Sequence, residues 1–153
     1  TAAIGGFAFF SGFGSAASGG WESSRTMSLK VLPAIAFLAV GGFLILSLSA
    51  NALLPAGDMR RTVAFLASLA PAAFLMGVPF PAALSRLSSV SPASIPYAWG
   101  INGFFSVAGA SLASIGALWI GLRGTVIAGG MLYIAAGALY PRIIYNPNRR
   151  TLT

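Results

Sequence analysis

Few side chains of this chain can carry acid, base or metal chemistry. Its 153 residues include no Cys and no His, and only two Asp or Glu against nine Lys or Arg. The missing thiols and imidazoles exclude disulfides, thiolate or imidazole metal sites, and Ser-His or Cys-His catalytic pairs. We also find no carboxylate pair and no glycine-rich phosphate loop between a strand and a helix. The sequence therefore predicts no catalytic residue, no metal site and no bound cofactor.

The polar candidates lie around two prolines and one asparagine. Pro79 and Pro81 lack a backbone N–H, so they predict either a structural helix break or a binding or gating site of the kind found in interrupted transporter helices. Asn102 is the most polar side chain in a long apolar stretch. Its amide is expected either to bond to a carbonyl freed by a proline or to bind a ligand. Trp99 beside it suits the aromatic belt at a membrane surface.

The composition indicates an integral membrane protein. Hydrophobic residues make up 57% and charged residues 7% of the chain, against roughly 25% charged residues in an average soluble domain. The net charge of +7 does not indicate nucleic-acid binding, because the basic residues are scattered and form no stripe. They are expected to set the topology and to contact lipid headgroups. The candidates for headgroup contact are Arg86, Arg123 and Arg142.

A helix needs about 20 mainly apolar residues to cross a bilayer. About five uncharged segments qualify, at about 1–20, 31–54, 62–84, 97–122 and 124–140. We expect an all-α, polytopic helical bundle that forms one membrane domain over residues 1–153. The short link at 121–124 predicts that the last two spans form an antiparallel hairpin. Because the chain opens at Thr1 without a Met, we expect it to be part of a longer protein.

The distribution of basic residues predicts how the spans are oriented. With five spans, the first loop, the third loop and the C-terminal tail share one side, which carries Arg25, Lys30, Arg86, Arg142, Arg149 and Arg150. The opposite side carries Arg60, Arg61 and Arg123. Because cytoplasmic loops are enriched in Lys and Arg, this distribution predicts a cytoplasmic C-terminus and an outer Thr1.

Small residues at four-residue spacing let two membrane helices approach closely. The first span has them at Ser11, Gly12, Gly14 and Ser15, and the fourth at Ser106 and Gly109. We expect both spans to lie inside the bundle and to pack on other helices of this chain. A homodimer face or a substrate groove is the alternative.

Three motifs in this order resemble a known family. They are FSGFGSAASG at 10–19, MGVPFPAALSRL at 76–87 and WGINGFFSVAGASLA at 99–113. Together they resemble the C-terminal membrane region of bacterial spermidine-synthase-like polytopic proteins, often described as fused transporter-like and spermidine-synthase proteins. The matching residues are Ser11, Gly12, Gly14, Ser15, Gly77, Pro79, Phe80, Pro81, Arg86, Trp99, Gly100, Asn102, Gly103, Ser106 and Gly109.

The resemblance implies a helical membrane region that accompanies a soluble aminopropyltransferase-like domain. The glycine-rich strand-turn-helix and the acidic catalytic residues of that domain are absent from these 153 residues. Spermidine-synthase activity is therefore not expected of this chain as given. The resemblance implies no individual role for the matching residues.

Three functions stay open at this point. The first is a non-catalytic membrane module of a spermidine-synthase-like protein, acting as an anchor or scaffold. The second is an accessory structural subunit of a larger respiratory or photosynthetic membrane complex. The third is a small-molecule transporter fragment whose path is lined by Pro79 and Asn102. Expected partners are membrane lipids and either other membrane subunits or a further domain of the same protein, with no nucleic acid. The expected location is the bacterial inner membrane.

Overall fold

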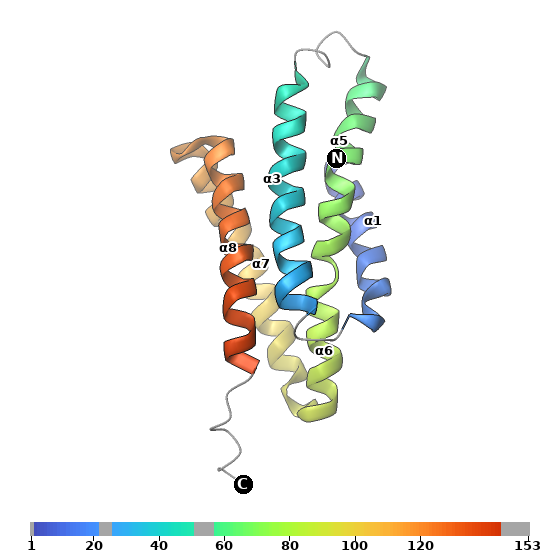
Figure 1. Ribbon diagram of the computed structural model, residues 1–153, viewed down its shortest axis with the longest axis vertical. Coiled ribbons are helices and arrows are strands. Elements are labelled where there is room, and N and C mark those ends of the chain that lie inside the picture. Colours follow the sequence, from blue (N-terminus) through green and yellow to red (C-terminus); the bar gives the residue numbers. More distant parts are fainter. Residues whose placement is uncertain (1, 22–25, 51–56, 145–153) are drawn as a thin grey trace.

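The structure is a computed structural model that describes residues 2–21, 26–50 and 57–144. In these segments every regular element is a helix and no strand is present. The elements form an elongated helical bundle (Figure 1). The predicted all-α fold class is confirmed.

The helices follow one another in an up-and-down order. They are α1 (Ala2–Ala16), the 3₁₀ turn η1 (Ala17–Gly20), the π-helical turn η2 (Met27–Val31), α3 (Leu32–Leu48), α5 (Asp58–Met76), α6 (Pro79–Val90), the 3₁₀ turn η3 (Pro92–Ser94), α7 (Ile95–Trp119) and α8 (Gly121–Ile144). Successive long elements run in opposite directions, except that α6 continues the direction of α5 (Figure 1).

Four segments of the described chain are long and apolar enough to cross a membrane. They are Met27–Leu48, Asp58–Val90, Pro92–Trp119 and Gly121–Tyr140. The first expected span is not among them; its helix α1 has 15 residues and is followed directly by η1. Residue 1 and residues 51–54 of the expected spans lie outside the described part of the chain. The structure thus supports a multi-pass membrane protein.

Prolines and one glycine mark the ends of several helices. Pro79 and Pro96 occupy the first turns of α6 and α7, where a missing N–H costs little. Pro33 follows the π-helical turn η2, which continues directly into α3. Only Ile120 separates α7 from α8, and Gly121 has φ +74°. Glycine adopts this left-handed conformation without strain, which explains the tight hairpin predicted at this link.

α3 lies at the centre of the bundle. It packs on α5 at one side and on α8 at the other, while α1 packs on α5 and α7 packs on α8 and α6 (Figure 1). Met27, Val31, Ile35 and Val78 are the largest fully buried side chains. The core therefore lies where η2 and the start of α3 meet the break between α5 and α6.

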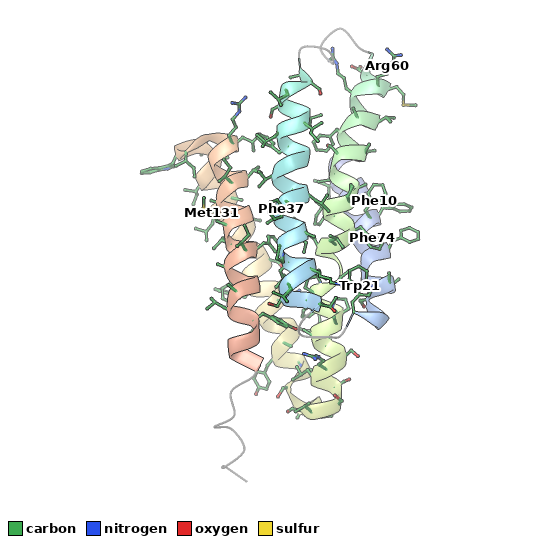
Figure 2. The ribbon with its side chains drawn as sticks, viewed as in Figure 1. Phe10, Trp21, Phe37, Arg60, Phe74 and Met131 are labelled. Atoms are coloured by element: carbon green, nitrogen blue, oxygen red, sulfur yellow. The ribbon has the colours of Figure 1, made fainter. Side chains whose placement is uncertain are left out.

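The two ends of the bundle carry different connections. We call the end with the start of α5 and the α7–α8 turn the hairpin end, and the end with η3 and the last turn of α8 the α6 end (Figure 1). Figure 2 shows Arg60 at the hairpin end and Trp21 at the level of the break between α5 and α6. The described basic residues of the hairpin end are Arg60, Arg61 and Arg123, and those of the α6 end include Lys30 and Arg86.

The fourth expected span does not lie inside the bundle. None of the residues of α7 is buried, and Ser106 and Gly109 are both exposed. A methyl group added at Gly109 would meet no atom within 4 Å. Small residues permit a close helix contact but do not drive one, and α3 already has α5 and α8 as neighbours. Within the described residues Ser106 and Gly109 are thus exposed, and their predicted role in helix packing stays a prediction.

Candidate functional site

The closest helix contact joins α1 to α5. A methyl group added at Gly14 would overlap the carbonyl group of Phe74, and one added at Gly77 would overlap the carbonyl group of Ser11. The two backbones therefore touch directly, which only glycine permits at both positions. Figure 2 shows Phe10 of α1 and Phe74 of α5 on this side of the bundle.

The other two small residues expected in this contact have different surroundings. Gly12 is exposed, and a methyl group there would meet nothing within 4 Å. Ser15 is half-buried. The face of α1 that approaches α5 is thus defined by Ser11 and Gly14, which are three residues apart and share one side of the helix.

The helix break at Gly77 and Val78 is satisfied by its own backbone. Pro79 cannot donate to the carbonyl of Leu75, but the Val78 N–H donates to that oxygen at 3.1 Å. The Gly77 N–H donates to the carbonyls of Ala73 and Phe74 at 3.3 and 3.1 Å. The chain therefore continues from α5 into α6 through one tight turn.

Asn102 does not bridge to this break. Its backbone carbonyl accepts a hydrogen bond from Ser106 Oγ at 2.7 Å, while its side-chain amide makes no hydrogen bond within the described residues. The residue is exposed. The expected bond from Asn102 to a carbonyl freed by Pro79 or Pro81 is absent from the described residues. The Leu75 carbonyl, which Pro79 leaves without its helical donor, accepts from the Val78 N–H instead.

An aromatic contact joins α6 to α7 instead. The rings of Phe80 and Trp99 meet edge to face, with centroids 4.9 Å apart and planes at 82°. Pro79 and Pro81, on either side of Phe80, are half-buried. The WGING and GVPFP motifs thus lie side by side through their aromatic residues.

A hydrogen bond of the kind expected of Asn102 is made elsewhere in the bundle, by a serine that the sequence analysis did not identify. Ser28 is 3% exposed, and its hydroxyl donates to the Gly137 carbonyl at 2.7 Å. In a regular helix that carbonyl accepts from the N–H four residues on, and here that residue is Pro141, which has none. Ser28 therefore satisfies a carbonyl freed by a proline, as polar side chains do inside membrane proteins.

The three arginines expected at lipid headgroups lie on two helices. Arg86 is half-buried in α6, and Arg123 is exposed in the first turn of α8. Arg142 lies in the last turn of α8, and its side chain is outside the described part of the structure. The described carboxylate, Asp58, lies 3.9 Å from Arg61 in an exposed ion pair.

An apolar groove lies between α3 and α8. It has a volume of about 360 Å³ and nine lining residues, none of which has a polar side chain. Phe37 of α3 and Met131 of α8 border it and are 74% and 63% exposed; Figure 2 labels both. No sequence motif predicted this groove, because it depends on the distance between two helices.

Comparison with protein-family models, with curated proteins and with solved structures finds no match to this chain. The resemblance to spermidine-synthase-like membrane proteins therefore stays an expectation. Within the described residues, no three His, Cys, Asp or Glu side chains come together in a group that could hold a metal ion.

Proposed function

We propose that this chain is a helical membrane module that anchors or scaffolds a partner and has no catalysis of its own. The single observation that carries the proposal is α7. This helix has 25 residues, none of them buried, and it belongs to a segment apolar enough to cross a membrane. Although α7 packs on α8 and α6, the described part of the chain leaves most of its surface uncovered and open to a partner.

The surface of α7 has the composition of a helix-docking face. Phe104 and Phe105 are 68% and 66% exposed, and Gly109 has open space where a side chain would be. Close approach at small residues is one way in which membrane helices associate. The partner is a helix of another membrane subunit or of a further domain of the same protein. The resemblance to spermidine-synthase-like membrane proteins favours a further domain of the same protein.

The proposal places the module in a bacterial inner membrane with its α6 end in the cytoplasm. Lys30 and Arg86 lie toward that end, and the sequence adds the two arginines at 149–150 on the same side. The excess of basic residues in cytoplasmic segments supports this orientation. A domain tethered there would face the cytoplasm.

Site-specific photo-crosslinking in native membranes tests the scaffold role. A benzoylphenylalanine replaces Gly109 in one variant and Gly12 in a control, since both positions are open and exposed. We expect one discrete protein adduct from position 109 and none from position 12. Intact mass and peptide mapping then show whether the adduct belongs to another subunit or to a larger parent polypeptide. Lipid adducts alone at position 109 would contradict the proposal.

Transport is not proposed. The side chain expected to line a path, that of Asn102, is exposed and does not approach the break at Pro79 through any hydrogen bond in the described structure. Flux through reconstituted vesicles that is lost in Asn102→Ala would favour transport over the scaffold role.

A further inference from the structure

Two glycines, Gly41 and Gly130, shape the apolar groove between α3 and α8. A methyl group added at Gly130 would meet Val40 at 2.8 Å, so the two helices are close at this point. A methyl group added at Gly41 would meet nothing within 4 Å. The hollow above Gly41 is therefore free space enclosed by apolar side chains of the two helices.

A cation lies at the mouth of this groove. Ile127, Gly130 and Ile134 line the groove from α8, and Arg123 precedes them by four, seven and eleven residues. This spacing puts Arg123 on the same face of the helix. Because helical side chains tilt toward the N-terminus, Arg123 extends from the groove toward the hairpin end, where α8 begins.

This cation has no counter-charge in the described part of the chain. The whole chain has two carboxylates. Asp58 is paired with Arg61, and Glu22 lies outside the described residues. Within the described residues Arg123 makes no ion pair, so its guanidinium is available to an anionic group from outside the protein.

The length of the site matches one leaflet of a bilayer. Arg123 and Ile134 are eleven residues apart, which corresponds to about 16 Å along a helix. The hydrocarbon core of a bilayer is about 30 Å thick, so one leaflet is about 15 Å. The site as a whole, an apolar groove with a cation beyond its outer end, therefore complements the acyl chain and the phosphate of a phospholipid.

We propose that the groove between α3 and α8 binds one phospholipid. The acyl chain lies along Gly41 and Gly130, and the phosphate is bound by the Arg123 guanidinium. A guanidinium binds phosphate oxygens strongly, and an anionic headgroup is preferred because the site supplies no carboxylate for a headgroup ammonium. This lipid site is formed by α3 and α8, so it does not depend on the scaffold role proposed for α7.

Two variants separate the acyl site from the headgroup site. Gly41→Leu fills the groove without meeting any existing atom, and Gly129→Leu is its control, since position 129 on α8 is equally open but does not line the groove. Arg123→Gln removes the phosphate contact. Arg60→Gln is the matching control, because Arg60 is an exposed arginine at the same end on α5.

The binding assay is native mass spectrometry of the purified, delipidated full chain, titrated with phosphatidylglycerol or with diacylglycerol of the same acyl chains. We expect one phosphatidylglycerol to be retained by the unmodified chain and by both controls. Gly41→Leu should lose both lipids. Arg123→Gln should weaken phosphatidylglycerol binding about fivefold, the effect of one basic side chain near a lipid surface, and leave diacylglycerol binding unchanged.

A second measurement on the unmodified chain covers the case in which Gly41→Leu does not fold. Phosphatidylglycerol with a diazirine on its acyl chain is photolysed in phosphatidylcholine vesicles, and labelled peptides are mapped. Labelling concentrated on Phe37 and Met131 supports the site. Even labelling of all exposed apolar residues, including Phe104, means surrounding lipid only and overturns the proposal, as does a dimer whose second copy is crosslinked in the groove.

Discussion

Glycine at two positions decides how closely α1 and α5 approach. Gly14→Ala or Gly77→Ala would put a methyl group into the backbone of the facing helix, so we expect each to lower the free energy of unfolding by about 1–3 kcal/mol. Gly12→Ala is the control, since its methyl group is free and alanine favours a helix by up to about 1 kcal/mol over glycine. Denaturation of the purified variants in detergent measures whether each substitution lowers or raises the free energy of unfolding. Equal effects at positions 12 and 14 would contradict the contact.

The hydroxyl of Ser28 replaces a missing backbone donor. Ser28→Ala leaves the Gly137 carbonyl without its 2.7 Å partner, and we expect a loss of about 1–2 kcal/mol in the free energy of unfolding. Pro141→Ala returns an N–H to the helix and should restore part of that loss in the Ser28→Ala background. Ser106→Ala, whose hydroxyl is exposed and bonds within its own helix, should change little. No recovery in the double variant would show that the serine acts in another way.

At the scale of the element, the sequence predicted where helices lie better than where they end or what they touch. The third expected span, 62–84, corresponds to α5 and α6 together, which run from Asp58 to Val90 with a break at Gly77. Hydropathy missed the last part of α6 because the residues after Leu84 are mostly polar, although the helix continues through them to Val90. The packing of Gly14 follows a small-residue pattern, but the same pattern in α7 meets no partner among the described residues, because small residues allow contact without requiring it. Ser28 was missed because its partner is 109 residues away.

An aromatic contact joins the start of α7 to α6, and its contribution is testable at the same scale. Phe80→Ala removes the edge-to-face contact with Trp99, which is worth about 0.5–1.5 kcal/mol beyond its buried area. We expect faster hydrogen exchange over the first turns of α7 in this variant. The control is Phe104→Ala, whose ring contacts only its neighbour Phe105 among the described aromatic residues. Unchanged exchange in Phe80→Ala would mean that α7 is positioned by α8 alone.

At the scale of the whole molecule, the absence of cysteine allows a direct measurement of topology. The chain has no native Cys, so a single Met59→Cys or Val90→Cys is the only thiol, at positions that are 78% and 83% exposed. These residues lie at opposite ends of the segment Asp58–Val90, which is long enough to cross a membrane. The loops and tail expected on the side of Val90 contain more Lys and Arg than those on the opposite side. This excess predicts that the side of Val90 is cytoplasmic. A membrane-impermeant maleimide should therefore label position 59 in intact cells and position 90 only after permeabilisation. The reverse pattern would invert the orientation and keep the fold, whereas labelling of both positions from outside would mean that α5 and α6 do not cross the bilayer together.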